Sequence, residues 1–142
     1  MPKAPRVNWQ PISQMPLIAG MIKDSLDDTR EHLGTLTKAR DRPHVLDDAT
    51  IDRIERVHTE QMDYVDIYTQ QISRWRTEKL SAAQGRELDR MGKQNQQLRE
   101  VTANVLTLAG ELRRGTIERA LGMSDLELGL QALLGNQFSG RR

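Results

Sequence analysis

The chain has 142 residues, of which 29% are charged and only 4% aromatic; its net charge is +1 and it contains no cysteine. This length builds one domain with a modest core. The absence of cysteine excludes disulfides, thiolate metal sites and cysteine nucleophiles. A net charge this small gives no overall attraction to nucleic acid. An apolar core drawn from Leu, Ile, Val, Ala and Met, beside many Glu, Lys, Arg and Gln, favours long helices. We therefore expect an all-α protein.

The N-terminal region contains no apolar run that resembles a signal peptide. Its most apolar stretch, MPLIAGMI (residues 15–22), is far too short to cross a bilayer. We expect a cytoplasmic protein that makes no contact with a membrane.

Four of the five prolines lie in the first 16 residues, which predicts an irregular, proline-rich arm over residues 1–14. Trp9 gives this arm a large apolar side chain, which either folds back onto its own bundle or docks on a neighbouring molecule. Pro16 is suited to the first turn of a helix, and Pro43 is suited to stop one. Between them the apolar residues recur every three or four positions, which predicts a first helix over residues 16–40.

The middle of the chain carries two apolar seams of similar length. Each seam alternates steps of three and four residues, the spacing that keeps one stripe of a helix against a partner helix. The first seam predicts a helix over residues 48–79 and the second a helix over residues 82–114. The seam residues are Ile51, Ile54, His58, Gln61, Val65, Tyr68, Ile72 and Trp75, followed by Leu88, Met91, Asn95, Leu98, Thr102, Val105, Ala109 and Leu112.

The stretch between the seams predicts a turn rather than one continuous rod. Ser81 and Gln84 form a capping box, in which each residue satisfies a backbone N–H group at the start of a helix. Lys79 precedes the box and suits the negative end of the preceding helix dipole. The two helices should therefore form a long antiparallel hairpin, with Gly115 ending the second.

A second capping box, Ser124 to Glu127, opens a short helix that is apolar nearly all round and that Gly135 ends. This element either plugs one end of its own bundle or contacts another subunit. We expect residues 15–135 to form a single helical bundle, with the first helix packed along the hairpin, and residues 136–142 to form a flexible tail. The expected partner or oligomer contacts in this helix are Leu126, Leu130, Leu133 and Leu134.

Polar residues interrupt both seams. A buried amide such as that of Asn95 accepts only those helix alignments that satisfy its hydrogen bonds, so we interpret Asn95 as fixing helix register or oligomer state. If the hairpin pairs about Ser81, Asn95 lies near Asp66. Residues 23–66 hold 12 acids against 7 bases and residues 67–142 hold 8 acids against 12 bases. The two halves should attract each other, within one chain or across an oligomer.

Two patterns raise metal chemistry. Glu55 and His58 form an E-x-x-H unit, as used in di-iron bundles, but the chain has no second copy of it. Acidic pairs three residues apart, such as Asp28 with Glu31 and Glu60 with Asp63, have the shape of a magnesium site in an all-α nucleotide hydrolase. Acids this frequent also produce such pairs by accident. We therefore assign no catalytic residue, metal ligand or cofactor.

Basic residues gather around the predicted hairpin tip. They offer a face that can follow a phosphate backbone, although neighbouring acids weaken its field. This face, which makes nucleic acid the alternative partner, comprises Arg74, Arg76, Arg86, Arg90 and Lys93.

Three helices with two long seams bury little core per residue, so we expect a homo-oligomer, with a dimer favoured. The leading hypothesis is a non-catalytic interaction or assembly module that self-associates and binds a protein partner. Trp9 and the leucines of the C-terminal helix are its expected contact elements. A nucleic-acid-associated protein is the alternative, followed by a metal-dependent nucleotide hydrolase.

Overall fold

The computed structural model describes residues 7–42 and 46–121, the last six of these by their backbone alone. A short 3-10 turn, η1 (Ile12–Gln14), leads into α1 (Met15–Arg40). Two further helices follow, α2 (Asp48–Arg76) and α3 (Ala82–Leu121). The described part of the chain contains no strand, so the expected all-α bundle is confirmed.

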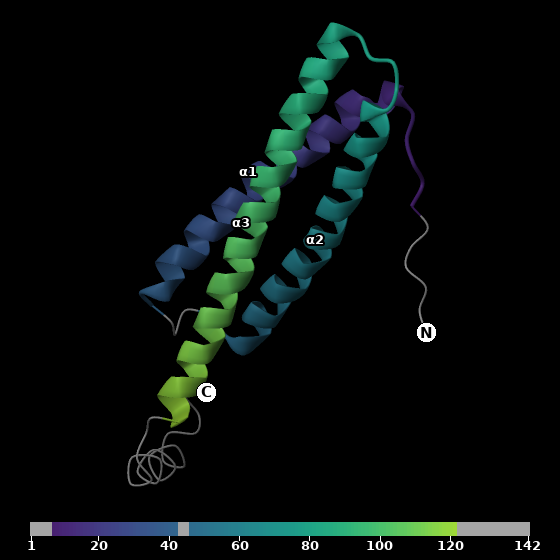
Figure 1. Cartoon of the computed structure of the whole chain (residues 1–142). Coiled ribbons are helices and arrows are strands. Elements are labelled where there is room, and N and C mark those ends of the chain that lie inside the picture. Colours follow the sequence, from purple (N-terminus) through teal and green to yellow (C-terminus); the bar gives the residue numbers. More distant parts are fainter. Residues whose placement is uncertain (1–6, 43–45, 122–142) are drawn as a thin grey trace, which may run out of the picture.

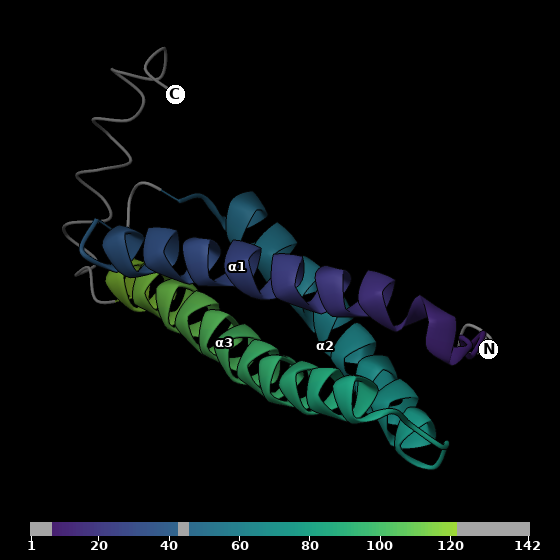
Figure 2. The same ribbon diagram turned by 90° about the horizontal axis from the view of Figure 1, so that it is seen from above.

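The three helices are not equivalent in the bundle (Figures 1 and 2). α2 and α3 run antiparallel as a hairpin, and α1 crosses them. α3 packs against both α1 and α2, whereas the backbones of α1 and α2 approach each other at few points. α3 is therefore the central helix, and α1 and α2 lie against it side by side.

The hairpin turns where the sequence predicts it. The Ser81 N–H donates to Oε1 of Gln84 over 2.9 Å, and the Gln84 N–H donates to Oγ of Ser81 over 3.1 Å. These two bonds form the predicted capping box and start α3. At the start of α2, the Asp47 carboxylate accepts from the Thr50 N–H over 2.8 Å. Hydrogen bonding from the Thr50 side chain, and then from this N–H, lowers the pKa of Asp47.

Two predicted helix ends are wrong. α2 ends at Arg76 rather than at residue 79. Directly after Arg76, the Thr77 N–H donates to the Arg74 carbonyl. α3 does not stop before Gly115 but continues to Leu121. A glycine ends a helix when it adopts a positive φ, and no described glycine does so. Gly115 instead keeps the helical conformation, at a cost of about 1 kcal/mol relative to alanine.

The core consists of three apolar clusters stacked along the bundle. The cluster at the hairpin end contains Met15, Ile18, Ala19, Ile22, Tyr68, Ile72, Trp75, Leu88 and Met91. The middle cluster contains Leu26, Val65, Leu98 and Val101. The cluster at the opposite end contains Leu36, Ile51, Val105, Leu108, Ala109 and Leu112.

Buried polar groups join the helices between these clusters. The Gln61 amide donates to the hydroxyls of Thr29 in α1 and Thr102 in α3, each over 2.8 Å. One α2 side chain thus connects all three helices. Because this amide satisfies both hydroxyls, moving any of the helices along its axis would leave buried polar atoms unpaired.

The antiparallel register agrees with the predicted one to within about one helical turn. Asn95 contacts the Val65 carbonyl, next to Asp66, while the Asp66 carboxylate accepts from Arg99 over 2.7 Å. Further along, Arg113 pairs with Asp52 and Glu55. These contacts join acids of α2 to bases of α3, in agreement with the predicted attraction between the acidic and basic halves.

Candidate interaction face between α1 and α2

Because α1 and α2 meet at few points, one side of the bundle is a shallow face formed by these two helices. Large apolar side chains stay exposed on it: Leu17 is 61% exposed, Met21 45%, Val57 43% and Tyr64 57%. Of the large apolar residues that the structure describes as exposed, only Val7, in the arm, lies outside the helices. Monomeric proteins rarely gather such side chains on one surface without a binding role.

Helical spacing shows that these residues share a face. Leu17 and Met21 are one turn apart, and His32 lies 11 residues (three turns) beyond Met21, so all three lie on one side of α1. On α2, Val57 and Tyr64 are seven residues apart, which is two turns. His32 and Val57 line the same cavity, so these two helix sides adjoin. We call the surface formed by Leu17, Met21, His32, Val57 and Tyr64 the α1/α2 face.

An open cavity of about 390 Å³ hollows the α1/α2 face at the end away from the hairpin turn. This volume is within the range of pockets that hold small molecules or side chains of a partner. Its charged lining is one arginine, Arg53, and it includes no carboxylate. The full lining is His32, Thr35, Leu36, Leu46, Thr50, Arg53, Ile54, Val57 and His58.

Two histidines of different exposure meet at this cavity. His58 is 3% exposed, and its ring packs edge-on against that of exposed His32, with centroids 5.5 Å apart. Nδ1 of His58 lies 2.7 Å from the Ile54 carbonyl, which can only accept, so Nδ1 carries the proton. Burial lowers the pKa of His58 below 6.5, and His32 lowers it further, against an opposing effect of the Ile54 bond.

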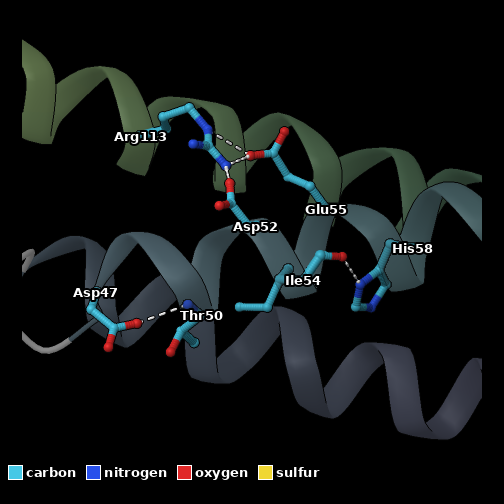
Figure 3. Close-up of polar contacts among 7 residues, drawn as sticks. All are labelled: Asp47, Thr50, Asp52, Ile54, Glu55, His58 and Arg113. Carbon is cyan, nitrogen blue, oxygen red and sulfur yellow. Dashed lines mark hydrogen bonds and ion pairs between the residues drawn. The ribbon is translucent and has the colours of Figure 1, made fainter.

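The E-x-x-H unit does not converge on one point (Figure 3). Glu55 points to α3, where it accepts from Nε of Arg113 over 2.8 Å, whereas the His58 ring leaves α2 on another side. Asp52 accepts from the same guanidinium. Across residues 7–42 and 46–115, no three His, Asp or Glu side chains gather as metal ligands would. The acids of the other patterns, Asp28, Glu31, Glu60 and Asp63, are exposed.

The N-terminal arm lies on its own chain at the hairpin end. Gln71 accepts from the Gln10 N–H over 2.8 Å, and the Trp75 indole N–H donates to the Gln10 carbonyl over 3.0 Å. Trp9 is half-buried and lies under the Arg74 guanidinium. The Cζ atom of Arg74 is 4.2 Å from the centroid of the Trp9 ring. Of the two arrangements open for Trp9, the structure shows folding back; its contact with a partner stays a prediction.

Asn95 is buried within the hairpin. Its amide N–H groups donate to the Val65 carbonyl and the Thr69 hydroxyl of α2, over 3.2 and 3.0 Å. Its Oδ1 meets no donor within the part of the chain that the structure describes. Such an unsatisfied oxygen costs stability, which agrees with a residue that selects alignment rather than strengthens packing. Its role in an oligomer stays a prediction.

The predicted basic face is largely engaged by acids or aromatics. Arg76 pairs with Asp89 over 2.9 Å and Arg90 pairs with Glu87 over 2.8 Å. Arg74 stacks on Trp9 as described above, while Arg86 and Lys93 are exposed. The remaining predicted contacts, Leu126, Leu130, Leu133 and Leu134, lie outside the described residues.

The sequence contains a signal for the α1/α2 face that lies beside the two seams and is not part of them. Leu17 and Met21 each precede a core residue, Ile18 and Ile22, and Val57 and Tyr64 each precede a seam residue. Apolar residues beside a seam widen the apolar stripe beyond what one partner helix covers. Only the positions of the helices show that no described segment covers these additional apolar residues.

None of the described helices has both the length and the apolar character that crossing a membrane requires. Comparison with family models, curated proteins and solved structures finds no match to this chain.

Proposed function

We propose that the protein is a non-catalytic interaction and assembly module that self-associates through the α1/α2 face and binds a protein partner. The observation that carries this proposal is the exposure of four large apolar side chains on the adjoining sides of α1 and α2, one of which, Val57, also lines an open cavity. Covering such a surface removes apolar area from water, at about 25 cal/mol per Å². Trp9 and the leucines from Leu126 to Leu134 remain its proposed further contacts.

Self-association is favoured as the first use of this face. A surface made of apolar side chains from both α1 and α2 can pack on its own copy about a two-fold axis. Such packing would add helices to a three-helix bundle and approach the four- or six-helix arrangements in which apolar stripes are fully covered.

Size-exclusion chromatography with light scattering tests the proposal on the full-length protein. We expect a dimer that Leu17→Asp with Tyr64→Asp converts to monomer, weakening self-association by at least about ten-fold. Both positions are more than half exposed, so the helical circular dichroism should not change.

A matched control places the same two charges elsewhere. Thr59 and Gln70 are exposed on α2, on a side that does not line the cavity. Thr59→Asp with Gln70→Asp should leave the dimer intact. A wild-type protein that stays monomeric at every concentration, or a control as disruptive as the test variant, would contradict the proposal.

A further inference from the structure

The cavity on the α1/α2 face has the chemistry of a site for an apolar helix with acidic residues near one end. Its walls are mainly aliphatic, from Leu36, Leu46, Ile54 and Val57, and Arg53 stands at its rim. Away from the cavity the α1 side of the face carries Asp28, one turn before His32. An acidic ligand is therefore better placed at the cavity than along the rest of the face.

A segment of this chain outside the described residues matches these properties. Residues 124–134 contain five leucines, with Asp125 and Glu127 as the charged residues and no lysine or arginine. The sequence predicts a helix here. On a helix, Leu126, Leu130, Leu133 and Leu134 fall on one face, with the spacing by which amphipathic helices bind in apolar grooves.

The course of α3 indicates from which molecule this segment comes. Leu112 is the last buried residue described on α3, and the helix continues nine residues further, roughly 13 Å. Figure 1 shows this end of α3 reaching past the neighbouring ends of α1 and α2. Two residues, Gly122 and Met123, then connect α3 to Ser124. The described part of α3 thus ends beyond the neighbouring helix ends, three residues before the segment begins in the sequence.

A return of the segment to its own chain's cavity would require a reversal of direction directly after α3. A helix over residues 124–134 is about 16 Å long, so after such a reversal it would reach the level of Leu112. Leu112 belongs to the same cluster as Leu36 of the cavity wall, so the chain's own segment is the competing occupant. The cavity lining described also comes from α1, α2 and the residues just before α2, not from α3.

We infer that residues 124–134 of one molecule dock as a helix in the α1/α2 cavity of a second copy, reciprocally in a dimer. Leu130, Leu133 and Leu134 enter the aliphatic part of the cavity, and Asp125 or Glu127 faces Arg53. This inference rests on the proposed self-association and names the segment that occupies one part of the face.

Cysteine cross-linking of the full-length protein tests the inference, because the natural chain has no cysteine. Thr35→Cys places a thiol at the cavity and Gln131→Cys places one in the segment. The two single variants are mixed, equilibrated and oxidised mildly. We expect a disulfide-linked dimer of the two variants at several-fold the yield of a mixture of Glu100→Cys with Gln131→Cys, since Glu100 is exposed on α3 away from the cavity.

Each outcome shows whether the segment in the cavity comes from the same chain or from a second copy. Adding Leu130→Asp to the Gln131→Cys chain should return the yield to that of the control mixture. A double variant with Thr35→Cys and Gln131→Cys that closes within a monomer would overturn the inference in favour of the chain's own segment. Equal yields from test and control mixtures, with a dimer still present by light scattering, would overturn the inference and leave the proposed self-association standing. A wild-type monomer would overturn both.

Discussion

The two ends of the bundle are closed by different means, although both are built from the same three helices. At the hairpin end, Trp75 fills the core and the N-terminal arm crosses over it, held by Gln71 and the Trp75 indole. At the other end no described segment performs this role, and the space between α1 and α2 remains an open cavity beside His58. The comparison shows that the arm covers one end of the bundle, whereas no described segment covers the cavity at the other end.

The chemistry of the closing segments also differs. The arm binds by backbone hydrogen bonds to Gln71 and Trp75, which fix it in one place. The cavity offers aliphatic walls and a single arginine, which suit an amphipathic helix rather than an extended strand. The hairpin end is therefore closed by an intramolecular contact, and the open end is the place of the proposed contact between molecules.

The largest effect should come from removing the side chain that closes the hairpin end. Trp75 is fully buried, so Trp75→Ala should lower the free energy of unfolding by about 3–5 kcal/mol, measured by urea denaturation. Trp9→Ala, which removes a half-buried side chain together with its stacking on Arg74, should cost less, about 1–2 kcal/mol. Similar losses for the two variants would mean that the arm, rather than the core beneath it, closes this end.

An intermediate effect is expected at the polar contact between the two ends. Gln61→Ala removes the amide that satisfies Thr29 and Thr102, so it should lower the free energy of unfolding by about 1–3 kcal/mol. Gln70→Ala, at an exposed position of the same helix, should change it by less than about 0.5 kcal/mol. A neutral Gln61→Ala would show that this contact does not stabilise the bundle.

The smallest effect should appear as a pH dependence of the open end. Burial lowers the pKa of His58 in the folded state, so the unfolded chain binds the proton more readily. The contribution of His58 to stability is complete above pH 6.5 and decreases as the pH falls through the folded-state value, by at most about 1.4 kcal/mol per pH unit.

Urea denaturation at pH 7.5 and 5.5 measures this contribution as the difference between wild type and His58→Gln. Carboxylates titrate in both proteins and largely cancel. His32→Gln should retain most of the pH dependence, because desolvation of His58 and not its neighbour is the main cause. A wild type no more acid-sensitive than His58→Gln would show that the ring is hydrated and that the open end is wetter than its burial indicates.

Local chemistry made much of the fold predictable. The capping box at Ser81 and Gln84 and the cap at Asp47 are satisfied within a few residues of the chain, so the turn and the start of α2 can be read from sequence. Trp75 and Leu98 are buried as the seams predict, because apolar residues spaced three and four apart lie on one side of a helix, and that side packs against its neighbours. The predicted end of α3 at Gly115 is wrong, because a glycine allows a helix to end but does not force it to end.

The sequence by itself therefore determined three helices, their hairpin and most of the residues of their core, because capping and periodicity act over a few residues. Only the tertiary structure decided that α3 is central, that the arm lies over Trp75 and that Leu17, Met21, Val57 and Tyr64 are exposed on the adjoining sides of α1 and α2. These features depend on distances between segments far apart in the chain. Side-chain packing and hydrogen bonds across helices set those distances, and no local pattern encodes them.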